Sequence, residues 1–447
     1  MKQPIVIIGA GWAGIAAAVH AVRNGMRVVL VEERPYLGGR ARSFVDRTTG
    51  EVIDNGQHLM MGAYRSTLST IQQLGTASTY RAQRALRVRF VESGGKGDVL
   101  DAAVLGVRGK LGVALGILRL RGIGLGGRLA ALRFAVRLQL GVVKTKGRTC
   151  LEMLRAEGQT DDAITRLWEP IVLATLNAPM DRAAASLLTT VLGRAFFGAA
   201  SDSALLIPTD GLSAFIDPVT TLVEAAGGSV VTSTSVESIH AEGQRVTDVV
   251  LSNGQTINPA GVICAVPPRA LSRIDGAPRV EIDGLTYSPI VSIYLWYDKA
   301  WLDDAFVAVL GTTIQWVFNR RRMVNASAEI TAAYPGHVAL TISAGSHLVD
   351  RPAEDIIAAC DAELRTVFAS MHGARLLHGL VIKEKAATFL ATPDVEAQRP
   401  PCTTHFANLM LAGDWTDTGL PATIEGAAQS GITAADKLVE QLRSRHS

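Results

Sequence analysis

The first thirty residues alternate between short apolar runs and glycine-rich turns. Residues 4–9 are apolar and rich in β-branched side chains, residues 15–24 are rich in alanine, and residues 27–31 are apolar again. A short apolar run that ends at a glycine is typical of a buried parallel strand, and the alanine-rich run predicts a helix that stops at Gly25. The pattern therefore predicts a β-α-β unit of about 30 residues.

Similar signals recur far along the chain. Residues 229–231, 246–251, 261–265 and 409–412 predict further strands, with an Asn-Gly turn at 253–254, and residues 424–438 predict a helix. Alternating runs within 285–395 are suited to an antiparallel sheet. Because 447 residues exceed one ordinary core, we expect three units. They are a discontinuous nucleotide-binding domain (1–84, 204–284 and 396–447), a substrate domain (85–100 and 285–395) and a helical, basic and apolar subdomain (101–203).

The turn after the first strand has the spacing G-x-G-x-x-G, formed by Gly9, Gly11 and Gly14. The first glycine permits a tight turn, the second lets a pyrophosphate approach the backbone, and the third lets the helix pack closely on the strand. Glu32 ends the second strand at the position where an acid holds a ribose hydroxyl. Together these residues predict a dinucleotide site at the N-terminus of the helix.

Two further segments point to a flavin dinucleotide. Gly39 is the second of two adjacent glycines that allow close backbone approach, and Arg40 offers a positive charge to a pyrophosphate. Asp414 follows a predicted strand, where its carboxylate can hold a ribityl hydroxyl. Thr423 and Ile424 open the last helix, whose N-terminus can stabilise the negative charge of a reduced flavin. We therefore expect both ends of the chain to meet around FAD.

Charge and cysteine content narrow the class of protein. A net charge of +3 over the whole chain is too small to indicate nucleic-acid binding, and the four cysteines form no C-x-x-C pair. We expect reduced thiols in a cytoplasmic protein, with neither a disulfide framework nor a metal site. We expect no signal peptide, and no apolar run in the sequence is long enough to span a bilayer.

The distribution of charge is more informative than its sum. Between Asp101 and Glu152 there are ten Lys or Arg residues and no acid, and the intervening residues are mostly Leu, Val, Ile, Ala and Gly. This composition is typical of a segment that lies in a membrane interface. A solvated helical subdomain is the alternative, and nucleic-acid binding lacks the interleaved aromatic residues that would support it. We expect peripheral attachment at the inner face of the cytoplasmic membrane.

Longer segments identify the chain by resemblance. Glu32 followed by GGRA (38–41) and AGDW (412–415) resemble the flavin amine oxidase and phytoene desaturase superfamily. The segments DNGQHLMMGAYRSTL (54–68), LWEPIVLATLNAP (167–179) and PTDGLSAFIDP (208–218) resemble the hydroxysqualene dehydroxylases, also called squalene-associated FAD-dependent desaturases. The resemblance implies an α/β fold: a Rossmann-type, glutathione reductase-like FAD domain, an antiparallel-sheet substrate domain and a helical insertion that contacts a membrane. It also implies that the backbone of Val236 meets the adenine.

The resemblance further implies a reaction. Hydroxysqualene would lose its hydroxyl and gain a hydride from reduced flavin N5, giving squalene and water in squalene and hopanoid biosynthesis. A general acid must protonate the leaving hydroxyl, and His58 is preferred over Asp54 because histidine titrates near neutral pH. No second G-x-G-x-x-G motif is evident, so the sequence does not identify the donor that reduces FAD. Aromatic candidates for stabilising a cation are Trp168, Phe196, Phe197, Trp296, Trp316 and Trp415.

Three other functions are compatible with the same cofactor. A phytoene-type desaturase would move hydride from substrate to flavin, in the opposite direction. An amine oxidase often carries an aromatic residue two positions before the acid of the last helix, where this chain has Thr423 before Glu425. The third is a membrane scaffold that binds flavin without catalysis.

Overall fold

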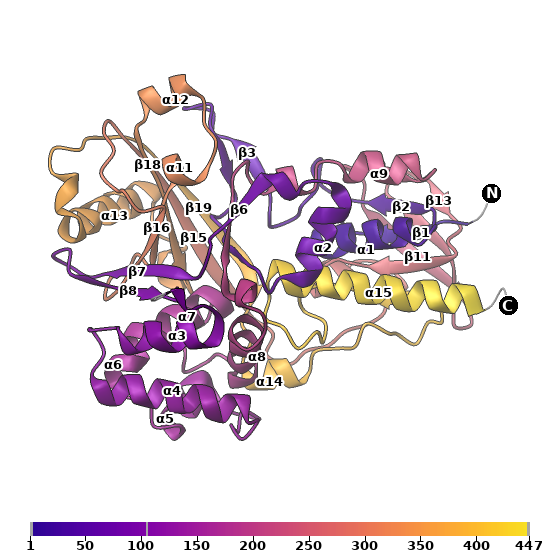
Figure 1. The fold of residues 1–447 in the computed structure, drawn as a ribbon. Coiled ribbons are helices and arrows are strands. Elements are labelled where there is room, and N and C mark those ends of the chain that lie inside the picture. Colours follow the sequence, from indigo (N-terminus) through magenta and orange to yellow (C-terminus); the bar gives the residue numbers. More distant parts are fainter. Residues whose placement is uncertain (1–2, 104–105, 445–447) are drawn as a thin grey trace.

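The computed structural model describes residues 3–103 and 106–444, which form two lobes. In Figure 1 one lobe holds both termini and the predicted nucleotide-binding elements. The other lobe combines a large sheet with a group of helices below it, drawn in purple. Several chain segments cross between the lobes, so the junction brings together residues from distant parts of the sequence.

A five-stranded parallel sheet forms the centre of the first lobe. Its order is β10 (Ser229–Val231), β2 (Val28–Val31), β1 (Ile5–Ile8), β14 (Gly261–Cys264) and β20 (Leu409–Leu411), and each neighbouring pair is parallel. Every residue of β1, β2, β14 and β20 is buried, as expected of a sheet covered on both faces. The predicted strands are therefore confirmed.

Two helices from opposite ends of the chain pack side by side on this sheet. Helix α1 (Trp12–Arg23) starts three residues before the predicted position, and α15 (Ile424–Ser444) extends beyond the predicted end. A Cβ atom at Gly431 of α15 would lie 2.0 Å from the carbonyl oxygen of Ala13, so only glycine permits this close contact. The remaining elements of the lobe are α2 (Arg65–Leu74), α9 (Val219–Ala225), α10 (Pro268–Leu271), β11 (Val236–Glu242), β12 (Arg245–Leu251) and β13 (Thr256–Ile257).

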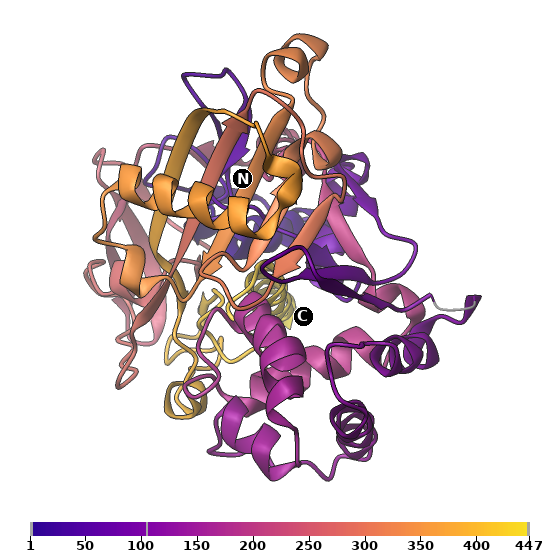
Figure 2. The same cartoon turned by 90° about the vertical axis from the view of Figure 1, so that its left-hand side faces the viewer.

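A seven-stranded sheet forms the second lobe. Its order is β19 (Leu376–Phe389), β15 (Tyr287–Tyr297), β18 (Gly336–Ser343), β17 (Trp316–Asn319), β16 (Phe306–Val309), β7 (Arg87–Val91) and β8 (Gly97–Asp101). All neighbouring pairs are antiparallel except β16 and β7, which are parallel because β7 arrives from a distant part of the chain. Helix α13 (Ala353–Val367) lies across one face of the sheet, as Figure 2 shows. Short helices α11 (Arg320–Met323), α12 (Ala328–Ala333) and α14 (Pro393–Ala397) complete the lobe.

The helical subdomain follows β8. It contains α3 (Gly109–Leu118), α4 (Leu125–Gln139), α5 (Cys150–Ala156), α6 (Asp161–Ala163), a π-helical turn (Ile164–Trp168), α7 (Glu169–Leu176) and α8 (Ala185–Phe196). Phe134 and Trp168 pack edge to face at 5.4 Å in its core. Within the described residues, no helix is both long enough and apolar enough to cross a membrane.

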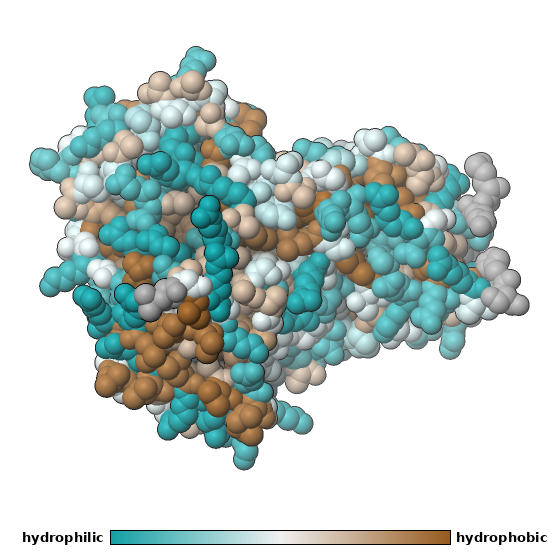
Figure 3. Space-filling model, viewed as in Figure 1, coloured by the Kyte–Doolittle hydropathy of each residue, from teal (hydrophilic) through white to brown (hydrophobic). Residues whose placement is uncertain are grey.

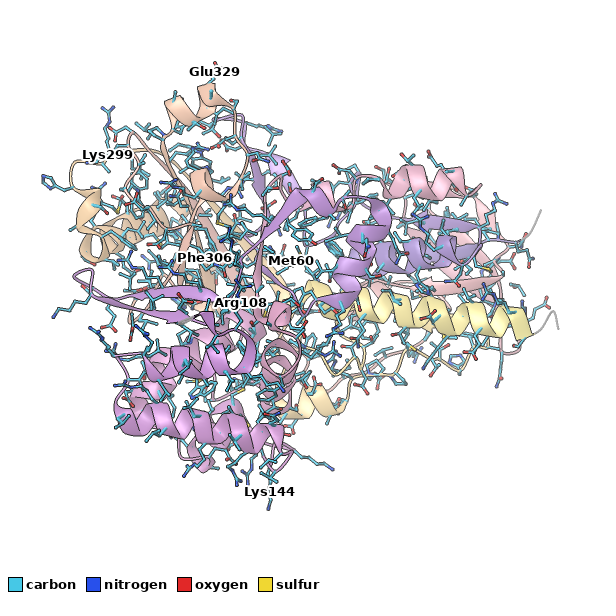
Figure 4. The ribbon with its side chains drawn as sticks, in the orientation of Figure 1. Met60, Arg108, Lys144, Lys299, Phe306 and Glu329 are labelled. Carbon is cyan, nitrogen blue, oxygen red and sulfur yellow. The ribbon has the colours of Figure 1, made fainter. Side chains whose placement is uncertain are left out.

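A short hairpin bridges the two lobes. It consists of β3 (Ser43–Val45) and β4 (Val52–Asp54), and the loop after it leads to β5 (Met60–Met61), which pairs with β9 (Leu205–Pro208) beside β6 (Tyr80–Ala82). Figure 4 labels Met60 at the junction of the lobes. The loop between β4 and β5 carries His58, so the fold places this residue where the lobes meet.

Candidate functional site

The predicted cofactor residues gather at one edge of the parallel sheet. Gly9 follows β1, Glu32 follows β2, and Asp414 lies just beyond β20, all at the carboxyl ends of parallel strands. Val236 opens β11, and the segment before it hydrogen-bonds to Glu32 through the backbone N–H of Thr234, at 3.1 Å. Ligands of open α/β sheets bind at this edge.

The three glycines of the first turn occupy different environments. Gly9 has φ +95°, a conformation that favours glycine. A Cβ atom at Gly14 would lie 1.8 Å from the carbonyl oxygen of Gly9, so helix and strand can approach only without a side chain there. A Cβ atom at Gly11 would meet nothing within 4 Å, and no side chain caps the N-terminus of α1. Open space beside uncapped N–H groups fits the pyrophosphate of a dinucleotide.

Glu32 is buried and oriented by backbone donors. Its carboxylate accepts hydrogen bonds from the N–H groups of Ala10 at 2.7 Å and Arg34 at 2.9 Å. The first bond ties the acid directly to the glycine-rich turn. The carboxylate is therefore held beside the place where the ribose of a dinucleotide would lie.

The glycine-rich segment 38–42 connects the turn after β1 to Asp414, which follows β20. Gly38 donates its N–H to the carbonyl of Ala10, and a Cβ atom at Gly39 would be 3.2 Å from Gly11 Cα. The Arg40 guanidinium lies 2.7 Å from the Asp414 carboxylate, which raises the pKa of Arg40 above its ordinary value. The structure thus brings together Arg40 and Asp414, 374 positions apart.

The start of α15 is built by its own first turn and by α2. The Thr423 hydroxyl accepts a hydrogen bond from the N–H of Gly426 at 3.1 Å, one turn into the helix that begins at Ile424. Glu425 is buried and caps α2 by accepting hydrogen bonds from the N–H groups of Ser66 and Thr67. Glu425 therefore has a structural role, because it joins the first turn of α15 to the first turn of α2.

Tyr64 lies beside this helix start. Burial and the negative charge of Glu425 raise the pKa of Tyr64 to about 12, although its hydroxyl also contacts Thr423. Its phenol is therefore uncharged near neutral pH, and no anion from this side chain opposes the charge of a reduced flavin.

The two candidate acids lie close together in the sequence but in different settings, since Asp54 ends β4 and His58 lies in the loop between β4 and β5. Asp54 is completely buried and accepts hydrogen bonds from the Ser43 hydroxyl at 2.7 Å and the N–H of Leu212 at 2.9 Å. His58 is half-buried, and its Nδ1 lies 2.6 Å from the carbonyl oxygen of Gly56. Since a carbonyl only accepts, Nδ1 carries the hydrogen and Nε2 is left for another partner. Of the two acids, only His58 has a partly exposed side chain.

The candidate aromatic residues are distributed across the molecule. Trp168 and Trp296 are buried in the cores of the helical subdomain and the seven-stranded sheet. Trp415 donates its indole N–H to the carbonyl of Val266, beside the glycine-rich turn, at 3.1 Å. Phe197 lines a pocket of about 460 Å³ between α2, α8 and α15, which also contains Arg65. Phe196 and Trp316 are half-buried.

The structure adds site residues that sequence reasoning missed. Asn55 donates one amide N–H to the carbonyl of Arg40 at 3.2 Å and another to Glu384 of β19 at 3.1 Å. Arg320 reaches Gln57 from the seven-stranded sheet, with a distance of 2.8 Å between guanidinium and amide oxygen. The only local signal for Arg320 was a run of three arginines directly after an apolar strand.

Comparisons with known proteins agree with this geometry. The profile of the flavin containing amine oxidoreductase family matches residues 12–439. A hydroxysqualene dehydroxylase of Rhodopseudomonas palustris is 31% identical over 98% of both chains, and one of Sinorhizobium fredii is 28% identical over 98% of both. An oxidoreductase of known structure from Methanosarcina mazei shares the fold, with a TM-score of 0.72, 16% identity and coverage of 97% of this chain and all of the other.

These findings decide the class of the protein. The site described above has an open glycine-rich turn, a buried and oriented acid at the end of β2 and a helix N-terminus without a side-chain cap among the described residues, and each fits a flavin dinucleotide. The cofactor is therefore FAD, and the protein is an oxidoreductase. The chain belongs to the flavin-containing amine oxidoreductases and, within them, to the hydroxysqualene dehydroxylase family.

Proposed function

We propose that this protein converts hydroxysqualene to squalene by reductive removal of the hydroxyl group, in squalene and hopanoid biosynthesis. The full-length likeness to hydroxysqualene dehydroxylases carries the proposal. The reaction consumes a proton and a hydride, breaks the allylic C–O bond, forms a C–H bond and releases water. Bound FAD, in its reduced form, supplies the hydride, and an external two-electron donor must reduce it again after each turnover.

His58 supplies the proton in this proposal. With Nδ1–H bound to the Gly56 carbonyl, the imidazolium form presents its second proton at Nε2. Protonation converts a poor leaving group into water, and the delocalised allylic cation can then accept hydride. Asp54 has no exposed surface, so we assign it to the support of the loop rather than to proton transfer.

The cofactor residues have complementary roles. The N–H groups at the start of α1 would hold the pyrophosphate, Glu32 the ribose and Asp414 the ribityl chain, while Val236 would contact the adenine through its backbone. The first turn of α15, at Thr423 and Ile424, would stabilise negative charge on the reduced flavin. Arg40, held by Asp414, adds a positive charge to the same site.

An anaerobic rapid-mixing experiment tests the reaction. The FAD-loaded protein is reduced, mixed with hydroxysqualene, and followed by flavin absorbance and product mass. We expect flavin oxidation together with formation of squalene. Unchanged flavin, or reduction of oxidised flavin by an isoprenoid, would contradict the proposal, and the second result would indicate a desaturase.

A substitution at position 58 tests the role of His58 as the general acid. We expect His58→Ala to abolish turnover while the purified protein keeps its bound FAD and yellow colour. His240→Ala, on the exposed strand β11, is the matched control and should leave turnover unchanged. Equal activity of the two variants would remove His58 from the mechanism.

We also propose that the helical subdomain rests on an anionic lipid surface at the inner face of the cytoplasmic membrane. Figure 3 shows a continuous apolar area over α3 and α4. We call this area the α3–α4 surface, and its exposed side chains are Leu111, Leu125, Leu129, Val136, Leu140 and Val142. Exposed cations occur in the same segment: Arg108, Lys110, Arg119, Arg121, Lys144 and Lys146.

Charge complementarity supports an anionic lipid surface as the partner. Among the described residues, no acid forms an ion pair with these six cations, so they are available to lipid phosphates. Figure 4 places Lys144 at the lower edge of the helical subdomain, below α4. Sedimentation with vesicles of anionic lipid tests the proposal. We expect binding at low salt, and a protein that stays in the supernatant would contradict it.

A further inference from the structure

Arg320 is a buried charge at the junction of the lobes. Only 2% of its side chain is exposed, and it begins α11 directly after strand β17 of the seven-stranded sheet. One Nη donates to the Gln57 amide oxygen at 2.8 Å, and the other donates to the carbonyl of Val52 at 2.8 Å. The same guanidinium lies 3.5 Å from the Asp54 carboxylate. All three partners belong to β4 and the loop after it.

The burial of this guanidinium requires those partners. A charge removed from water is costly unless an opposite charge and hydrogen bonds compensate it. Asp54 supplies the opposite charge, and the hydroxyl of Tyr294 donates to the Asp54 backbone carbonyl at 2.9 Å. The arginine and the aspartate therefore stabilise each other in a place where neither would be stable alone.

The seven-stranded sheet and the helix that follows β17 fix the three residues directly before His58. Gly56 lies against β15, where a Cβ atom would be 3.1 Å from the Ser292 hydroxyl. Asn55 bonds to Glu384 of β19, and Gln57 bonds to Arg320. His58 follows Gln57 directly and accepts an amide hydrogen bond from it through its backbone carbonyl.

We propose that Arg320 is a positioning residue that fixes the 54–58 loop, and with it the direction of the His58 imidazole. This inference rests on the proposed role of His58. Arg320 does not transfer a proton, because its guanidinium contacts the loop and not His58. Its planar group makes two directed bonds at once, which a lysine ammonium on a flexible stem reproduces poorly.

The neighbouring arginine is a matched control. Arg321 is also largely buried and also binds an acid of the hairpin, Glu51, but its other bond goes to the Tyr334 carbonyl. Both Arg320→Lys and Arg321→Lys disturb a buried ion pair. Only the first disturbs the 54–58 loop.

The test compares these variants as FAD-loaded proteins. We expect Arg320→Lys to lower kcat about 100-fold with KM nearly unchanged, since a displacement of about 1 Å in a reacting group has that effect. Arg321→Lys should keep kcat within about threefold. Hydrogen exchange of the peptide 54–61, measured without substrate, should become faster in Arg320→Lys and stay at the wild-type rate in Arg321→Lys.

A second, milder variant tests the same contact if Arg320→Lys does not fold. Gln57→Met removes one of the two hydrogen-bond acceptors of Arg320 and leaves both its bond to Val52 and its ion pair with Asp54, so we expect faster exchange and a smaller loss of kcat. Equal losses of kcat in Arg320→Lys and Arg321→Lys, or wild-type exchange of the loop in Arg320→Lys, would overturn the inference. If wild-type protein does not convert hydroxysqualene, the proposed function fails, while the exchange experiment still decides whether Arg320 fixes the loop.

Discussion

Two regions of this molecule depart from the usual distribution of polar and apolar groups, in opposite directions. At the junction of the lobes, charged side chains are buried; on the α3–α4 surface, leucine side chains are exposed to solvent. Burying a charge and exposing an apolar side chain both cost free energy. The two regions differ in where the compensation for that cost is found.

At the junction the compensation lies within the chain. Glu51 of the hairpin accepts hydrogen bonds from Trp296 and Arg321, and lies 2.9 Å from Nδ1 of His337. Burial alone would raise the pKa of Glu51, but the bonds with His337 and Arg321 outweigh it and hold that pKa below its ordinary value. The carboxylate therefore stays charged beside the buried Arg321 guanidinium, which needs an opposite charge.

Beside the α3–α4 surface, two arginines of α4 find partners within the chain, but the exposed leucines do not. Helix α4 buries Gly127, Ala131 and Phe134 on one side, while its exposed leucines lie on another. Arg133 bonds to the carbonyl of Glu157, and Arg137 lies 2.6 Å from the Glu157 carboxylate. The helix thus has a second apolar stripe with no cover among the described residues. A buried charge whose partners lie in the same chain is accounted for by the fold itself. An exposed apolar stripe instead indicates a partner outside the chain.

The largest expected effect tests the exposed leucines of the α3–α4 surface. Replacing Leu111, Leu125, Leu129 and Leu140 by serine removes apolar area worth about 1.5 kcal/mol for each side chain that enters lipid, so vesicle binding should weaken about 10⁴-fold. Sedimentation with anionic vesicles measures it. The control replaces three exposed apolar residues elsewhere by serine, namely Val45, Val52 and Leu377, and should bind like wild type. Equal binding by both variants would contradict the proposed surface.

The next largest effect tests the buried charges at the junction of the lobes. Glu51→Gln leaves Arg321 and His337 without their charged partner, and we expect the free energy of unfolding to fall by about 3–5 kcal/mol. Denaturant titration measures the change. Removal of both charges in Glu51→Leu/Arg321→Met should restore part of the loss, because two apolar groups need no compensation. A loss below about 1 kcal/mol in Glu51→Gln would show that the pair contributes little.

The pH dependence of the free energy of unfolding tests the same group of buried residues. Burial lowers the pKa of His337 to about 4, from an ordinary value of 6.5. Between these values the unfolded chain binds the proton more readily than the folded chain, so stability is present above 6.5 and is lost as pH falls toward 4, by up to about 3 kcal/mol. Glu51, with its lowered pKa, adds a further loss below its ordinary value of 4.5. His337→Asn should show a shallower decrease between pH 6.5 and 4, and an unchanged slope would contradict this assignment.

The smallest effect concerns the cations beside the leucines. We expect Lys144→Gln and Lys146→Gln each to weaken binding to anionic vesicles by about 1 kcal/mol, or roughly fivefold, and to have no effect with neutral lipid. High salt should remove the difference because it screens exposed charges. Lys437→Gln, on the exposed side of α15, is the control. A fivefold loss in this control as well would indicate attraction to net charge and not to a particular surface.

The sequence predicted the nucleotide-binding elements well because their signals are local. Gly9 and Glu32 each follow a strand whose apolar pattern is plain, and Gly14 lies in the first turn of α1, so their placement near one sheet edge follows from the β-α-β pattern. The start of α1 was placed too late because its first turn contains glycine, which sequence reasoning assigns to a loop.

The junction was beyond prediction from local pattern. Arg320 and Gln57 are 263 positions apart, and no periodicity connects them. Similarly, the composition of residues 101–152 indicated a basic, apolar segment, but not which stripe of α4 would be covered. With leucines on more than one side, the helix could be turned either way until its neighbours were in place.

The contact between α1 and α15 also has a consequence for biosynthesis. The first helix packs against the last one through Ala13 and Gly431, and β20 completes the sheet that β1 begins. A nascent chain on the ribosome therefore lacks one wall of the nucleotide-binding lobe until its final helix has emerged. We expect FAD to bind stably only once α15 has been synthesised and has packed against α1.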